Sequence, residues 1–167
     1  MEKGGKGEFL SNSNKVFLVL ATGVLLLDQL TKAAVSFILD MHEVRPLIHG
    51  LVNLTRVHNT GAAFGLLAGQ ASLLRTVVFL GVSFLAMGVV LWMVRQQRPD
   101  QKSEFVALSL VFGGAMGNVL DRARLGEVID FIDIHYRTYH WPAFNVADAA
   151  ISTGVVLLFW RLAFSRR

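Results

Sequence analysis

Two aspartates lie in apolar surroundings where a carboxylate is energetically costly. Asp130 sits within an apolar stretch, residues 128–131, and Asp148 comes just before the long apolar run 149–160. An ionised carboxylate at the centre of a bilayer costs roughly 2.5 to 3.5 kcal/mol, so such acids generally face a partner, water or a substrate. Two neighbouring carboxyls do not both ionise easily, so the pair supplies a general acid and a general base. Such a pair can activate water against an amide bond.

Other catalytic chemistries have little support. The chain has no cysteine, which excludes a thiol nucleophile and thiolate metal sites. Its five histidines include no helical His-x-x-x-His pair, so we expect neither a metal nor a cofactor. The serines lack a Gly-x-Ser-x-Gly context. A third acid, Asp133, follows Asp130 closely, and we expect a strand to place both on one face and a helix to separate them.

Three pairs of further polar residues are spaced so that the two members of each pair share a helix face. Each pair lies near the outer end of an apolar segment, so three helices would bring polar groups to one depth. The Asp28 and Lys32 pair is explained equally well by a structural ion pair, and Arg122 by a cation at the membrane interface. The pairs are Asp28 with Lys32, Asn118 with Arg122, and Asn145 with Asp148.

The composition indicates that membrane-spanning helices position these residues. Hydrophobic residues make up 53% of the 167, and the mean hydropathy is +0.50, which is more than one soluble core of this size usually holds. The net charge of +4 does not indicate nucleic acid, because the basic residues flank apolar runs. Four segments approach the roughly 20 residues that a spanning helix needs. They are close to residues 16–39, 72–94, 105–120 and 143–164.

The first segment could instead belong to a cleaved signal peptide, but the apolar core of a signal peptide is typically shorter than a full span. Here the apolar character resumes at Ala33, so the apolar segment is longer than such a core. Four crossings put both termini on one side, and the basic loop 95–102 favours the cytoplasm for that side. The outer face then receives the connections 40–71 and 121–142, of which residues 50–58 alternate as one or two strands do. We expect the glycines of 113–117 to pack helices closely and the polar tail 1–14 to be disordered.

Five short motifs occur in order along the chain, and together they resemble the bacterial lipoprotein signal peptidase family, also called signal peptidase II. The resemblance extends from about residue 16 to residue 164. Each motif is weak alone, but five in order at suitable spacing are specific. They are DQLTK at 28–32, NTGAAFG at 59–65, GGAMGNVLDR at 113–122, VIDF at 128–131 and FNVAD at 144–148.

The resemblance implies an all-α integral membrane protein, a four-transmembrane-helix bundle with a small periplasmic β-cradle and a short periplasmic helix. Residues 15–167 would form this single peptidase domain. It also implies an intramembrane aspartic endopeptidase that removes signal peptides from diacylglyceryl-modified prolipoproteins, cutting before the lipid-modified cysteine. Asp130 and Asp148 match the family's catalytic pair. The polar residues that bind substrate or support the pair match Asp28, Lys32, Asn59, Asn118, Arg122 and Asn145.

The expected partners are therefore the modified prolipoprotein and membrane lipids, with no nucleic acid, and we expect a monomer. The expected location is the bacterial inner membrane, with the active site near its periplasmic face. The alternative is a small polytopic transporter or proton-relay protein whose buried charges line an ion path. It is disfavoured because the acids cluster at the outer ends of the spans and leave the inner halves apolar.

Overall fold

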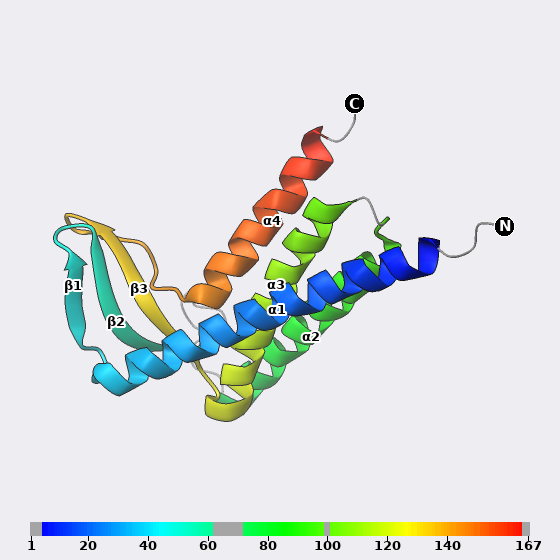
Figure 1. Ribbon diagram of the computed structural model, residues 1–167. Coiled ribbons are helices and arrows are strands. Elements are labelled where there is room, and N and C mark those ends of the chain that lie inside the picture. Colours follow the sequence, from blue (N-terminus) through cyan, green and yellow to red (C-terminus); the bar gives the residue numbers. More distant parts are fainter. Residues whose placement is uncertain (1–4, 62–71, 99–100, 165–167) are drawn as a thin grey trace.

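The structure is a computed structural model that describes residues 5–61, 72–98 and 101–164. Four long helices and four short strands make up the described chain (Figure 1). Their order is α1 (Gly5–Ile38), β1 (Val44–Ile48), β2 (Val52–Asn59), α2 (Ser72–Gln96), α3 (Lys102–Leu125), β3 (Val128–Tyr136), β4 (Tyr139–His140) and α4 (Val146–Phe164).

All four helices are long and apolar enough to cross a membrane, as the sequence predicts. The third is longer than the expected 105–120, because the charged residues at both of its ends have partners. Glu104 pairs with Arg161 of α4 at 3.4 Å, and Asp121 pairs with Lys32 of α1 at 2.7 Å. A hydropathy pattern ends at such charges, whereas the helix continues through them.

Helix α1 begins at Gly5 and continues without a break into the first span, so it includes residues 5–14 of the tail for which we expected disorder. Once a helix is nucleated, each further residue adds a hydrogen bond, so the apolar segment can extend its helix into a polar flank. Residues 1–4 lie outside the described chain. Residues 62–71, where the short helix expected between the first two spans would fall, also lie outside the described chain.

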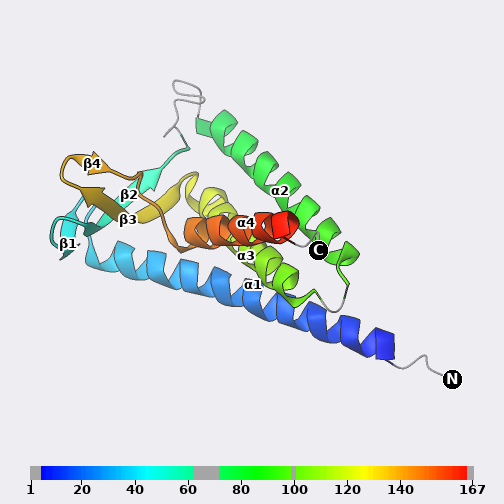
Figure 2. The ribbon, with the colours of Figure 1, turned by 90° about the horizontal axis from the view of Figure 1, so that it is seen from above.

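Helix α3 is the centre of the bundle and contacts α1, α2 and α4 (Figures 1 and 2). Its glycines allow this close approach, as expected. A Cβ added to Gly114 would lie 2.5 Å from the carbonyl oxygen of Ala147 on α4. A Cβ added to Gly113 would lie 2.5 Å from the carbonyl oxygen of Ala21 on α1. Small residues therefore bring three helix backbones together at the level of the polar residues.

The strands form one antiparallel sheet in the order β1-β2-β3-β4, which lies beyond the Ile38 end of α1 and away from the Phe164 end of α4 (Figure 1). The strand predicted at 50–58 is β2. It pairs on one side with β1 and on the other with β3, so the sheet joins the two connections expected on the outer face. The register places Val57 opposite Asp130 and Asn59 opposite Val128. Asp130 is thereby brought beside the end of β2.

Candidate active site

Asp130 lies in the buried first half of β3 and is only 1% exposed. Its two carboxylate oxygens accept hydrogen bonds from two amides, Asn145 Nδ2 at 2.7 Å and Asn59 Nδ2 at 2.9 Å. Burial raises the pKa of Asp130 to about 7, and the nearby charge of Asp148 raises it too, whereas the two amides and Lys32 act in the opposite direction. Asp130 can therefore hold a proton near neutral pH.

Asp148 lies in the first turn of α4 and forms a capping box with Asn145, the residue just before that helix. The Asn145 side-chain oxygen accepts a hydrogen bond from the Asp148 backbone N–H at 2.9 Å. In return, the Asp148 carboxylate accepts one from the Asn145 backbone N–H at 3.3 Å. This reciprocal arrangement satisfies the free N–H groups of a helix start, and the helix dipole stabilises an anion there. Local helix chemistry thus fixes the position of the Asp148 carboxylate.

Asn145 joins the two aspartates. Its side-chain oxygen caps α4, while its Nδ2 donates to Asp130 at 2.7 Å and to the Ile129 carbonyl at 3.2 Å. The side chain is fully buried. Asn118 of α3 completes the link, because it donates to the second Asp148 oxygen at 2.8 Å and accepts from Asn145 at 3.3 Å. The two carboxylates are therefore held by one continuous amide network.

A buried charged group lies behind this network. Lys32 lies between Asp28 at 2.8 Å and Asp121 at 2.7 Å, and it also donates to Asn118 at 3.1 Å. All three charged side chains are less than 5% exposed. Removing three charges from water is costly unless they are paired and hydrogen-bonded, as they are here. The ion pair predicted for Asp28 and Lys32 is therefore one half of a larger group.

The two acids of this group each hold the backbone next to one candidate catalytic residue. Asp28 accepts a hydrogen bond from the N–H of Ala147, the residue before Asp148, at 2.9 Å. Asp121 accepts one from the N–H of Ile129, the residue before Asp130, at 3.3 Å. Since Lys32 joins both acids, it links the supports of the two aspartates.

Sequence reasoning missed two members of this group, Asp121 and Gln29. Gln29 Nε2 donates to Asp121 at 2.9 Å and to the Gly117 carbonyl at 3.3 Å. Gly117 is needed there, because a Cβ on it would collide with an Asp28 carboxylate oxygen. The available signal was that Asp121 lies three residues after Asn118, on the same face of α3.

Arg122 and Asn59 approach the aspartates from the outside. The Arg122 guanidinium lies over the Phe79 ring of α2, 5.1 Å from its centroid, and interacts electrostatically with Asp148 and Asp130. Asn59 ends β2, and its side-chain oxygen accepts a hydrogen bond from the N–H of Gly61 at 2.8 Å, which orients the amide toward Asp130. Seven of the eight predicted residues thus belong to one hydrogen-bonded network, and Arg122 lies at its edge.

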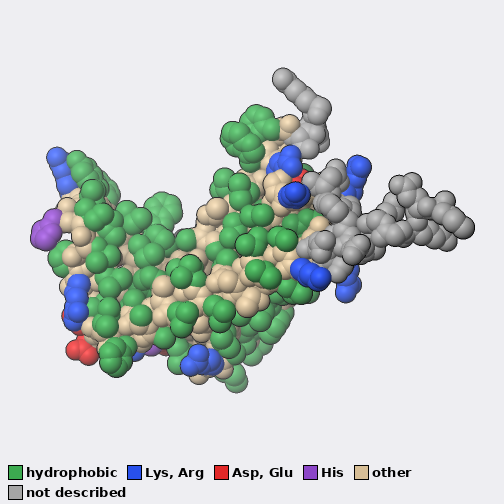
Figure 3. Space-filling view, in the orientation of Figure 1, with side chains coloured by type: hydrophobic (Ala, Val, Ile, Leu, Met, Phe, Trp, Pro, Cys, Tyr) green, Lys and Arg blue, Asp and Glu red, His purple; other side chains and the backbone are tan. Residues whose placement is uncertain are grey.

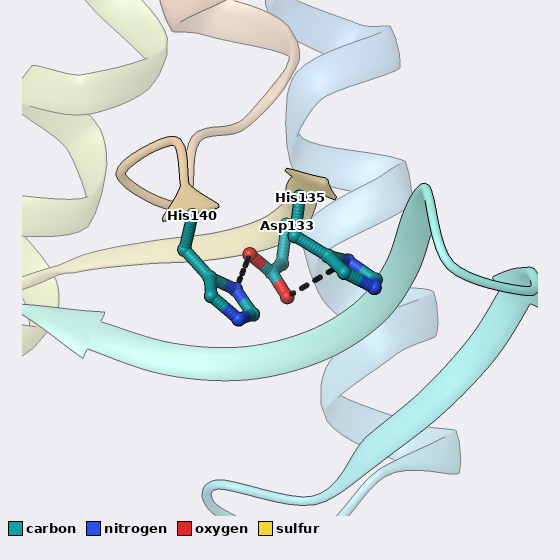
Figure 4. A group of neighbouring side chains, drawn as sticks. All are labelled: Asp133, His135 and His140. Carbon is teal, nitrogen blue, oxygen red and sulfur yellow. Dashed lines mark hydrogen bonds and ion pairs between the residues drawn. The ribbon is translucent and has the colours of Figure 1, made fainter. Parts of the chain in front are cut away.

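The prediction that a strand would place Asp133 on the same face as Asp130 is wrong. The two are three residues apart, an odd number, so successive side chains of β3 direct them to opposite faces. Asp133 lies instead with His135 and His140 (Figure 4). Burial alone would raise the pKa of Asp133, but hydrogen bonds from His140 and Asn53 outweigh it and hold that pKa below its ordinary value. Asp133 is therefore separate from the aspartate pair.

Two cavities reach the aspartates. One of about 340 Å³ is lined by Asp130, Asn59, Pro142 and other residues of the sheet side. The other, of about 360 Å³, is lined by Asp148 together with apolar residues such as Trp141. Figure 3 shows a hollow in the surface between the sheet and α4. Each carboxylate therefore lines a cavity of its own.

A third cavity, of about 260 Å³, adjoins the buried charged group and is lined in part by Lys32 and Asp121. Three buried polar atoms of its lining have no hydrogen-bond partner among the described residues, namely Ser36 Oγ, Arg56 Nε and His58 Nε2. A polar cavity of this size can hold water that satisfies such atoms.

Comparison with known proteins gives consistent results. Residues 20–164 match the family model described as Signal peptidase (SPase) II. The chain is 47% identical over 144 residues to a lipoprotein signal peptidase of Geobacter sulfurreducens, covering 86% of this chain and 89% of that protein. It is 48% identical over 143 residues to one of Syntrophus aciditrophicus, with the same coverage of 86% and 89%.

Solved structures agree with these relatives. A bacterial membrane enzyme solved at 1.9 Å resolution superposes with a TM-score of 0.78 at 29% identity, covering 89% of this chain and 92% of the other. A second, solved at 2.3 Å, gives 0.79 at 29% identity, covering 92% of each chain. The family model covers most of the chain, and the relatives are well above 30% identical over most of it. The chain therefore belongs to the signal peptidase II family.

Proposed function

We propose that this protein is an intramembrane aspartic endopeptidase that removes signal peptides from bacterial prolipoproteins carrying a diacylglyceryl group, cutting before the modified cysteine. Family membership supports the activity, and one geometric observation supports the catalytic type. Asp130 and Asp148 come from different elements, yet the buried Asn145 side chain binds both. Because the chain has no cysteine, a thiol nucleophile is excluded. The transporter alternative loses its support, because the relatives are peptidases.

The different surroundings of the two aspartates suggest different roles. Asp148, at the start of α4, would be the anion that takes a proton from the attacking water. Asp130, whose pKa burial raises to about 7, would hold the proton and donate it toward the scissile carbonyl oxygen. When the tetrahedral intermediate collapses, the proton on Asp148 would pass to the leaving amine, and Asp130 would take back a proton from a hydroxyl of the intermediate. No covalent intermediate with the enzyme is required.

The remaining polar residues would hold this geometry. Asn59, Asn118 and Asn145 orient the carboxylates by hydrogen bonds, and Asp28 with Lys32 anchors the start of α4. Arg122 is only partly buried and carries five N–H donors, and it would bind a carbonyl of the substrate. Holding reacting groups in position in this way removes much of the entropic cost of the reaction.

We expect the substrate to enter sideways from the membrane. The hollow between the sheet and α4 has apolar walls, and α2 and α4 expose many large apolar side chains that would face lipid (Figure 3). A signal peptide and the acyl chains next to the scissile bond would both remain in the bilayer during binding. The double anchoring would hold the bond at the depth of the aspartates.

The orientation that fits this reaction puts the sheet on the periplasmic side of the bacterial inner membrane and both termini in the cytoplasm. Lys and Arg side chains lie at both ends of the molecule in Figure 3, and the end of the bundle away from the sheet holds one group of them. Basic residues favour the cytoplasmic side, and Arg95, Lys102 and Arg161 belong to that end. We propose a monomer, since one chain contains both aspartates and their whole support.

The test is cleavage of a purified diacylglyceryl prolipoprotein by the reconstituted enzyme. Asp130→Asn and Asp148→Asn should each lower turnover by about 100- to 10,000-fold, because each removes an essential proton transfer, which contributes roughly that factor. The exposed acid Asp40 is the matched control, and Asp40→Asn should cleave normally. Normal turnover by either dyad variant, once its insertion is verified, would refute the assignment. An unmodified precursor tests the need for the lipid.

A further inference from the structure

A second cluster of chemically active side chains lies on the sheet, on the face opposite Asp130. Asp133 and His135 are two residues apart on β3, so they point to the same side. His140 of β4 is the direct cross-strand partner of His135. Figure 4 shows the Asp133 carboxylate between the two imidazole rings. The pairing of β3 with β4 thus gathers one carboxylate and two imidazoles.

The distances in this cluster are short. One potential ligand atom from each residue lies within 4.8 Å of the others. His140 Nδ1 is 2.8 Å from Asp133 Oδ1, and His135 Nδ1 is 3.9 Å from Asp133 Oδ2. Two ligands of one tetrahedral zinc ion are about 3.3 Å apart, given bonds of about 2.0 to 2.2 Å. Small side-chain rotations therefore suffice to bring all three onto one ion.

We propose that Asp133, His135 and His140 bind a divalent transition-metal ion of the zinc class. Two imidazole nitrogens and one carboxylate oxygen suit zinc, cobalt and nickel, whereas magnesium and calcium prefer oxygen ligands throughout. Three protein ligands leave a fourth position for water. His140 is half exposed, so an ion can enter from the solvent.

The surroundings of the cluster fit this role. Asn53 of β2 donates a hydrogen bond to Asp133 Oδ2 at 2.8 Å and lies 3.2 Å from His135 Nδ1. Such an outer partner orients a ligating carboxylate. The ion would replace the proton shared by His140 Nδ1 and Asp133 Oδ1, and that proton would be released to the solvent. Side chains of three strands then surround a single site.

The ion would have a structural role. Strand β4 consists of two residues only, and it leads through residues 141–144 to Asn145 and the start of α4. An ion between β3 and β4 would tie this hairpin together and so restrain the segment that precedes Asp148. Because Asp133 faces away from Asp130, the site would take no part in the hydrolysis itself.

The test uses full-length protein without a polyhistidine tag, purified in the presence of a chelator and then titrated with Zn²⁺, with Mg²⁺ as the control ion. The readouts are calorimetric stoichiometry, the rise in Tm, and the visible absorption of the Co²⁺ form. The variants are Asp133→Asn and the double change His135→Ala with His140→Ala. The matched control is His49→Ala, which removes an exposed histidine in the turn between β1 and β2.

We expect wild type and the His49 variant to bind one Zn²⁺ per chain, with a rise in Tm of about 5 °C at a hundredfold excess over Kd. The cluster variants should lose this rise. The loss of a hydrogen bond within the cluster can lower their Tm by itself, so each variant is compared with its own chelated sample. A metal-dependent rise that persists in the double variant, or wild-type protein that binds no Zn²⁺, would overturn the proposal.

Discussion

Replacing Asn145 by serine separates its two tasks, capping α4 and binding Asp130. Serine is as good an N-cap as asparagine, so Asn145→Ser retains the hydrogen bond to the Asp148 N–H. It has no amide to donate to Asp130, and the bond of 2.7 Å is lost. Asn145→Ala loses both. Comparing the serine and alanine variants therefore isolates the cap, and comparing serine with wild type measures the loss of the amide donations to Asp130, the Ile129 carbonyl and Asn118.

The size of the effect follows from the bonds. Asp130 is neutral in the proposed active form, and a hydrogen bond between neutral groups contributes roughly 0.5 to 1.5 kcal/mol. At about 1.4 kcal/mol per factor of ten, kcat/KM of the serine variant should fall about 2- to 10-fold. Because the Asn145 amide lowers the pKa of Asp130, its loss should raise that pKa above about 7. The alanine variant should be less stable than the serine variant by about 1 kcal/mol, the usual value of an N-cap.

The assay is kcat/KM for a diacylglyceryl prolipoprotein measured across pH, together with Tm of each variant in the same detergent. If Asp130 must be protonated, the serine variant should show a lower plateau whose alkaline decline begins at higher pH than in wild type. Full activity with an unshifted decline would refute the role of this amide. A loss of activity that only follows the loss of Tm, in both variants alike, would assign Asn145 a structural role alone.

Three further predictions follow from the same network. Wild-type kcat/KM should decline above pH about 7 as Asp130 ionises. Because the pKa of Asp130 is higher in the folded than in the unfolded protein, the contribution of Asp130 to stability should be lost as pH rises from about 4 to about 7. The Tm of wild type should therefore fall over this pH range, and the Tm of Asp130→Asn should not show this fall. Lys32→Met leaves Asp28 and a second acid buried without a cation, so the free energy of unfolding should fall by about 3 to 5 kcal/mol in a denaturant titration. Gly117→Ala should lower the free energy of unfolding by about 1 to 3 kcal/mol, because the new Cβ meets Asp28. The control is Gly88→Ala, where a Cβ has open space and the free energy of unfolding should stay within about 1 kcal/mol of wild type. Equal Tm changes in the two variants would contradict the close packing at Gly117.

Helical spacing and hydropathy predict much of this site, because both are local properties. The four spans follow from the length of apolar runs, and Asp28 with Lys32 follows from a spacing of four residues. The N-terminal position of Asn145 and Asp148 likewise follows from the sequence just before an apolar run. Such features depend on residues a few positions apart, so no knowledge of the tertiary structure is needed to predict them.

The rest depends on contacts between distant segments. Asn59 and Asp130 are 71 positions apart and meet only because β2 pairs with β3 in one register. Asp121 resembles a charge at the interface until α3 is packed against α1, where Lys32 meets it. The cluster around Asp133 escaped a search for helical histidine pairs, since it is formed by cross-strand pairing. Registers and helix contacts are tertiary properties, and short sequence patterns do not specify them.

The buried charged group holds the backbone beside each of the two aspartates. A group of two acids and one lysine carries an excess negative charge, which stability alone does not favour. Both acids, however, also accept backbone N–H groups, those of Ala147 and Ile129, so their negative charge is used to fix two chain segments. Asp148 lies at the N-terminus of α4, where a helix dipole favours an anion, whereas Asp130 on a buried strand has only amide partners. Under the proposed mechanism, Asp148 is therefore the base and Asp130 is the acid.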